Sequence, residues 1–349
     1  EGVEARCSGR FPLAKENYIR LLELLDGAGL GQSTAQYIRL GVMNALGMIE
    51  ASQGLASSLK WAELVETSPA YEVNAAVIRM LERLFQGDVR GAEAHQQKAD
   101  RLRIQNMARQ MYEGGHLLWE VHAHALSGDL TRMRRVIEEL TRMAKSHPHW
   151  EPVLRYALAE HHRLVRDPRS ALGEIEAVLA GVQVGTHQIW LNAALCHVSA
   201  LLELNEYRQA LEVAERHVAE AEGSLGFVPE NLTLVLGLAR AQLGDESCAA
   251  LVSDAIARLN ALGVTGLHLG LAYETRARVA LLLDETEDFA RYTELCRATF
   301  LLYENSALSG RYHRLLQEGR RKVGTGAERV VSTMISAARY NGSLMELAL

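Results

Sequence analysis

Hydrophobic residues make up 48% of the 349-residue chain, enough to build one large domain, two ordinary domains or one long repeat array. The formal net charge of −6 is spread along the chain. The sequence therefore lacks the basic surface expected of a protein that binds nucleic acid or an anionic membrane. The six prolines fall at breaks between apolar-periodic stretches, and strand signatures are scarce, so the sequence predicts an all-α fold.

The spacing of the cysteines and the hydropathy of the chain indicate the cellular compartment of the protein. The four cysteines lie far apart without a Cys-x-x-Cys pair, which disfavours a disulfide framework and a zinc site and favours a reducing environment. No apolar stretch is long enough to span a bilayer, and no signal peptide is recognisable. We therefore expect a cytoplasmic protein with no membrane partner. The chain starts at Glu1 without methionine, so we expect a piece of a longer protein.

The predicted helices alternate between a first and a second position in successive pairs. First-position helices are predicted at residues 33–53, 70–86, 106–127, 149–165, 186–204, 229–243 and 265–283. Second-position helices are predicted at 11–26, 55–66, 89–104, 130–145, 168–180, 206–222, 246–262 and 286–304. A further helix is predicted at 307–323, and a last one at 327–348.

One turn pattern joins the helices and recurs about every 40 residues. Its most regular copies are Gly87-Asp88, Gly128-Asp129 and Gly244-Asp245. Glycine permits the left-handed conformation that ends a helix, and aspartate then caps the next helix. A small residue about four positions further on, such as Ala92 or Ala249, is predicted to let the paired helices approach closely.

Two of these turns resemble the Gly-Asp-Tyr-x-x-Ala segment of the tetratricopeptide repeat family: Gly9-Arg10-Phe11-Pro12-Leu13-Ala14 and Asn205-Glu206-Tyr207-Arg208-Gln209-Ala210-Leu211. The likeness covers residues 9 to about 304. Most units are longer than the family's standard 34 residues, and its Trp and Tyr markers are mostly missing. Such long, irregular copies are similar to the repeat regions of large bacterial regulators.

The resemblance implies an α-solenoid, a right-handed superhelix of about seven to eight antiparallel helix pairs. We expect residues 1–306 to form the repeat array and 307–323 to form a terminal capping helix. Residues 327–349 are expected to form a C-terminal helix that either caps the array, links it to a following domain or makes a homodimer contact.

Motifs for catalysis and metal binding are absent from the sequence. Gly27–Thr34 is rich in glycine but lacks the lysine and the spacing of a phosphate-binding loop, and no strand precedes it. The thirteen histidines include no His-Glu-x-x-His spacing, and no Gly-x-Ser-x-Gly segment occurs. We expect no enzymatic activity, no cofactor and no bound metal.

Two basic clusters remain: Arg132, Arg134, Arg135, Arg142 and Lys145, and, near the end, Arg311, Arg314, Arg320, Arg321 and Lys322. Neither has the interleaved aromatic residues that favour nucleic acid. The sequence favours a solvated face for both clusters over a site for an acidic partner.

In the resembled family the first helix of each pair lines the concave face, where an extended peptide or a partner helix docks. The residues expected to face inward there are Asn74, His122, Tyr156, Glu160, Asn192, Asn231, Glu274 and Arg278. The alternative is that several of them belong to the core. Neighbouring inward positions are apolar, which favours a hydrophobic or helical ligand.

These observations predict a non-catalytic scaffold for protein–protein interaction, the regulatory or sensor repeat region of a larger bacterial signalling protein. Its partner would be a protein, a peptide or a neighbouring domain of the parent chain, and not nucleic acid. The alternative is a domain that senses a small-molecule inducer inside the superhelix.

Overall fold

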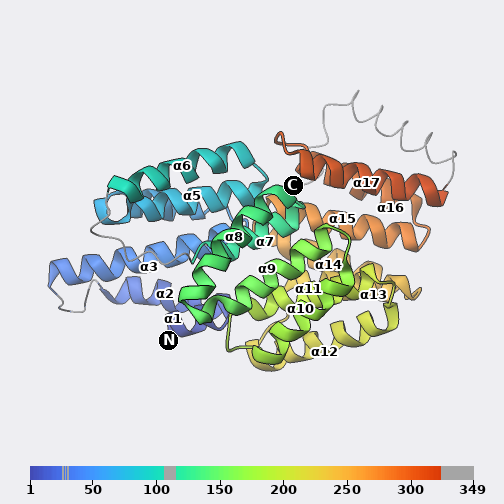
Figure 1. Ribbon diagram of the computed structural model, residues 1–349, viewed down its shortest axis with the longest axis horizontal. Helices are drawn as coiled ribbons and strands as arrows, with labels where there is room; N and C mark the ends of the chain where they lie inside the picture. The colour runs from blue at the N-terminus through green and yellow to red at the C-terminus, as the bar shows by residue number, and fades with distance from the viewer. Residues whose placement is uncertain (26, 28, 30, 106–114, 324–349) are drawn as a thin grey trace.

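The computed structural model describes residues 1–25, 27, 29, 31–105 and 115–323 (Figure 1). Within these ranges all regular secondary structure is helical, and the one piece of β-type pairing is an isolated bridge between Leu55 and Val264. The helices are α1 (Gly2–Cys7), α2 (Phe11–Leu25), α3 (Gln32–Ser52), α4 (Ser58–Glu66), α5 (Glu72–Gln86), α6 (Val89–Gln105), α7 (Leu117–Ser127), α8 (Leu130–Ser146), α9 (Glu151–Leu164), α10 (Pro168–Gly181), α11 (Ile189–Glu203), α12 (Tyr207–Leu225), α13 (Glu230–Gln242), α14 (Cys248–Ala261), α15 (Gly266–Leu282), α16 (Thr286–Phe300) and α17 (Ser306–Val323).

The predicted all-α class is confirmed, and most predicted helices match observed ones to within about two or three residues. The six-residue α1 was missed because it is too short to show a helical period. Part of the helix predicted at 106–127 is described, as α7, while the predicted C-terminal helix at 327–348 lies outside the described residues. None of the described helices has both the length and the hydrophobicity needed to cross a membrane.

The turns use the chemistry that the sequence predicts. Gly128 ends α7 in the left-handed conformation, at φ 81°, and the side chain of Asp129 accepts a hydrogen bond of 3.0 Å from the backbone N–H of Arg132. Arg166 and Asn205 reach positive φ without being glycine, at 66° and 62°. A left-handed turn in this fold therefore does not always require glycine.

Small residues lie where paired helices contact each other, and at one turn the buried residue is one position away from the predicted one. Ala14, Ala92 and Ala171 are buried where the turn pattern places them. The prediction was wrong by one residue at Ala249, which is only partly buried, because α14 begins at Cys248 and turns that side chain into the core.

The helices pack in sequence order. Consecutive helices pack on one another from α1 to α6 and from α7 to α17, and the first-position helices α3, α5, α7, α9, α11, α13 and α15 also contact one another in succession. The chain then returns on itself, because α15 packs against α5 and α7, and α17 packs against α7 (Figure 1). The largest apolar cluster accordingly joins residues from α3 to α7 with residues from α13 to α17.

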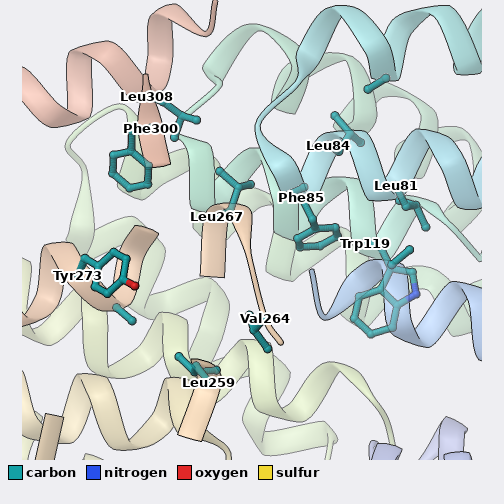
Figure 2. Close-up of a cluster of buried hydrophobic side chains, with 14 of the residues drawn as sticks. Leu81, Leu84, Phe85, Trp119, Leu259, Val264, Leu267, Tyr273, Phe300 and Leu308 are labelled. Carbon is teal, nitrogen blue, oxygen red and sulfur yellow. The ribbon is translucent and has the colours of Figure 1, made fainter. Parts of the chain in front are cut away.

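We call the contact between these early and late segments the seam. Its early side consists of Ser52, Gly54, Leu55, Phe85, Gln86, Gly87 and Leu126, and its late side of Val264, Thr265, Gly266, Leu267, His268, Asn305, Leu308 and Arg311. Figure 2 shows the apolar members Phe85, Leu267 and Leu308 in one buried cluster. The seam is what places the inward side chains of α7 and α15 against each other.

Candidate functional site

The inward residues predicted from the sequence lie along the first-position helices. They are Asn74 on α5, His122 on α7, Tyr156 and Glu160 on α9, Asn192 on α11, Asn231 on α13, and Glu274 and Arg278 on α15. His122, Tyr156, Glu160, Asn192 and Glu274 are buried, and the other three are partly buried. Five of the eight positions predicted to line a groove are therefore covered by the protein itself.

Three of these residues, His122, Tyr156 and Asn231, meet with His268 in a group that we call the histidine cluster. Two hydrogen bonds and a contact between the two imidazole rings join its members. His122 Nδ1 lies 3.2 Å from the Tyr156 hydroxyl, and Asn231 Nδ2 lies 3.4 Å from His268 Nδ1. The two imidazole rings are 5.7 Å apart, and Phe85 stacks on His268 at 5.1 Å. The cluster thus brings together four first-position helices, α7, α9, α13 and α15.

The hydrogen bonds of His268 define its tautomer. Its Nε2 lies 2.9 Å from the carbonyl oxygen of Ser52, which can only accept, so Nε2 carries the proton. Nδ1 is then free to accept a hydrogen bond from the side-chain amide of Asn231. Burial lowers the pKa of His268, even though the Ser52 carbonyl favours the charged form, and burial lowers the pKa of His122 to about 3, with His268 adding to this. Both rings are neutral at pH 7.

Acid should weaken this cluster. The groups facing the two imidazoles are Tyr156, Asn231, the Ser52 carbonyl and the Phe85 ring, none of them a carboxylate that could compensate a charge. The unfolded chain binds protons at these histidines near pH 6.5, whereas the folded chain does so only at lower pH. Stability should therefore fall with falling pH, by about 2 kcal/mol for His122 alone between pH 7 and pH 5.

Urea denaturation of the wild type and of His122→Gln at pH 7 and pH 5 measures this effect. The variant should lose less stability on acidification than the wild type does. The exposed His313 provides the control, and His313→Gln should follow the wild type. Equal acid sensitivity of all three proteins would contradict the assignment.

A second polar group surrounds Glu274, which is 1% exposed. Arg278 Nη2 lies 3.0 Å from one carboxylate oxygen of Glu274, and Arg311 Nε pairs with the other. Arg278 also binds Glu318, with its Nε 3.0 Å from the carboxylate. Burial alone would raise the pKa of Glu274, but the two arginines hold it below its usual range. Glu274 is therefore a buried carboxylate that forms ion pairs with two arginines, and of its two oxygens Oε2 accepts a hydrogen bond, from Arg311.

Arg311 was assigned by the sequence to a solvated basic face, and for this residue the interpretation was wrong. Besides pairing with Glu274, its Nη1 donates a hydrogen bond of 3.2 Å to the carbonyl oxygen of Leu126 at the end of α7. The late helix α17 thus contacts the early part of the chain through Arg311 as well as through Leu308, which lies against Gly87. Sequence spacing carries no signal for such a contact, because 185 residues separate the two partners.

The remaining inward residues take part in local packing. Glu160 is buried and pairs with Arg163, whose guanidinium also binds Glu203 on the neighbouring α11. Burial raises the pKa of Glu160. Asn192 is buried on α11, and Asn74 lies partly buried on α5.

Sequence analysis also missed a buried histidine pair between α11 and α12. His197 Nδ1 lies 3.3 Å from His217 Nε2, and His217 Nδ1 lies 2.9 Å from a carboxylate oxygen of Glu220. Trp190 packs edge-on against His217. Across the described part of the chain, no group of three or more histidines, cysteines, aspartates or glutamates is arranged to hold a metal ion.

The chain was compared with protein-family models, with curated proteins and with solved structures, and none of the three comparisons found a match.

Proposed function

We propose that the chain is a non-catalytic protein-interaction module built as a helical-repeat solenoid. The ordered packing of α3 to α15, in which each first-position helix contacts the next, supports this architecture. So does the recurrence of the tetratricopeptide-like turns. The role that fits such an array is the regulatory repeat region of a larger signalling protein.

The exposed apolar surface near the N-terminus carries this proposal. Six of the thirteen large apolar side chains that are exposed among the described residues lie within the first 37 residues. Leu13, Leu21 and Leu24 share one face of α2, and Leu24 is 59% exposed. Tyr37 on the neighbouring α3 is 62% exposed. Apolar side chains that gather on one part of a surface mark a contact site for another protein.

Site-specific photo-crosslinking in cells that express the parent protein tests the proposal. A photoreactive amino acid in place of Leu24 should yield one discrete adduct with another protein or with another domain of the parent chain. The same substitution at Leu262, which is 61% exposed on a different part of the array, is the matched control and should not yield that adduct.

A second variant tests the chemistry of the contact. Leu13→Arg places a charge on the same face of α2 and should reduce the adduct formed from position 24, while the far-ultraviolet circular dichroism stays helical. Identical adducts from positions 24 and 262, or an adduct unaffected by Leu13→Arg, would contradict the proposed surface.

A further inference from the structure

We infer that the corner of the array where the turn after α9 meets α17 is a binding site for a phosphate group. Arg166 supplies the side chain on the α9 side and Arg314 the one on α17, and we call these two residues the arginine pair. The inference goes beyond the proposed function, and neither depends on the other.

Packing at the C-terminal end of α7 places the arginine pair at one corner. Arg311 donates a hydrogen bond of 3.2 Å to the carbonyl oxygen of Leu126, which fixes the first half of α17 beside the end of α7. On the other side, a Cβ on the glycine that ends α7 would lie 4.0 Å from the side chain of Leu164, the last residue of α9. Arg166 follows Leu164 by two residues. Arg314 follows Arg311 by about one helical turn, so both members of the pair lie near the same helix end.

The carboxylates on the α17 side of this corner are already paired. Glu274 binds Arg278 and Arg311. Glu318, which lies one turn beyond Arg314, accepts two hydrogen bonds from Arg278, at 3.0 and 3.2 Å. The Arg314 guanidinium is therefore left without a carboxylate of its own on this helix.

The acidic neighbour of Arg166 is also occupied. Asp167 accepts a hydrogen bond of 3.2 Å from the backbone N–H of Ser170 and so caps α10, and its other oxygen lies 3.8 Å from His162 Nδ1. Both Arg166 and Arg314 are exposed. In the part of the chain that the structure describes, neither forms an ion pair with a carboxylate.

Positive charges face one another here instead. The Nη1 atom of Arg314 would lie 3.6 Å from a Cβ on Gly310, so this side chain points back along α17 toward the end that contacts α7. Partial burial, and then the charges of Arg311 and Arg166, lower the pKa of Arg314. Glu274 opposes this effect only in part. A bound anion would remove the repulsion between the arginines, so it gains more at this corner than beside two separate surface arginines.

The backbone at Arg166 is a second, independent observation. The turns after α5, α7, α9, α11, α13 and α15 each hold one residue at positive φ: Gly87, Gly128, Arg166, Asn205, Gly244 and Asp284. Glycine, asparagine and aspartate adopt this conformation readily, whereas other side chains do so rarely. Arginine is the exception among these six turns. Since the turn itself would be more stable with glycine or asparagine, the side chain of Arg166 accounts for the residue at this position.

Two guanidinium groups that approach from different elements suit a phosphate group. Each guanidinium presents a planar fork of N–H donors, and a phosphate monoester offers three acceptor oxygens and a charge of about −1.5 to −2 at pH 7. A carboxylate offers two oxygens and one charge, which one arginine satisfies. The phosphate can belong to a small molecule or to a phosphorylated side chain of another protein, and the chemistry of recognition is the same.

Isothermal titration calorimetry with inorganic phosphate, in a phosphate-free buffer at low ionic strength, tests the site. The chain is compared with Arg166→Asn and with Arg314→Gln. Asparagine is chosen at position 166 because Asn205 holds the same conformation at the corresponding turn, so this variant keeps the fold. Arg208→Gln is the matched control, since it removes the same charge from an exposed arginine on α12.

We expect saturable binding to the wild type and a dissociation constant that is about tenfold or more weaker in each of the two arginine-pair variants. Arg208→Gln should change the dissociation constant by less than about twofold. Absence of saturable binding to the wild type would overturn the inference. So would equal weakening in all three variants, which would indicate a general effect of net charge.

Two further ligands distinguish the source of the phosphate. Phenyl phosphate represents a small molecule, and an alanine pentapeptide with a central phosphoserine represents a protein. The arginine-pair variants should weaken the binding of both by the same factor, and the ligand that binds the wild type more tightly identifies the source. Binding of either ligand that is unchanged in both variants would contradict the site. None of these measurements involves the α2 surface, so their failure is distinct from failure of the crosslinking experiment.

Discussion

Gly266→Ala is expected to lower the free energy of unfolding by about 3 kcal/mol. The backbone at this position has φ 65°, and a side chain there costs roughly 1–2 kcal/mol. The added Cβ would also meet the carbonyl oxygen of Phe85 at 2.1 Å and the Cα of Gln86 at 2.8 Å, two backbone atoms that can yield only if the seam shifts. Overpacking of this kind adds about 1–3 kcal/mol. Urea denaturation measures the sum.

Gly263→Ala is the matched control. Gly263 lies three residues earlier and has φ 72°, but nothing lies within 4 Å of its added Cβ. The free energy of unfolding of this variant should fall by about 1 kcal/mol because of the unfavourable backbone conformation, with no further loss from steric overlap. If the two variants were equally stable, the close approach of α15 to the end of α5 would not exist in solution.

Glu274→Gln is expected to destabilise the protein by about 3 kcal/mol or more. The substitution keeps the shape of the side chain but removes the negative charge that Arg278 and Arg311 share. Arg278 retains Glu318, whereas Arg311 keeps only the Leu126 carbonyl. Because Glu274 is 1% exposed, water cannot take over its role.

Glu294→Gln serves as the control for charge removal. Glu294 pairs with Arg297 at 2.7 Å on α16, where the arginine side chain is 44% exposed. A pair at the surface contributes less than about 1 kcal/mol. Similar urea midpoints for the two variants would show that Glu274 is more hydrated than its burial indicates.

The helices and their turns could be predicted from the sequence because their causes are local. Gly128 ends α7 through its own backbone conformation, and Asp129 caps α8 with its own side chain. The turn that these two residues form can therefore be predicted without any tertiary information. The one-residue error at Ala249 arose because a helix start depends on which side chain, here that of Cys248, the neighbouring helices bury.

The seam could not be predicted in this way. Whether a stack of helix pairs returns on itself depends on the sum of many small rotations, none of which leaves a mark in the sequence. The sequence therefore indicated that His122, Tyr156 and Asn231 face inward but not that His268 would join them. For the same reason Arg311 looked like a surface residue, although it pairs with the buried Glu274.

The return of the late helices onto the early ones is most directly tested by nuclear Overhauser measurements on selectively labelled protein. The rings of Phe85 and His268 stack at 5.1 Å, so cross-peaks are expected between their ring protons, and between the Phe85 ring and the Leu267 methyl groups. Cross-peaks that connect only helices adjacent in the packing order, with none between α5 and α15, would contradict the closed array.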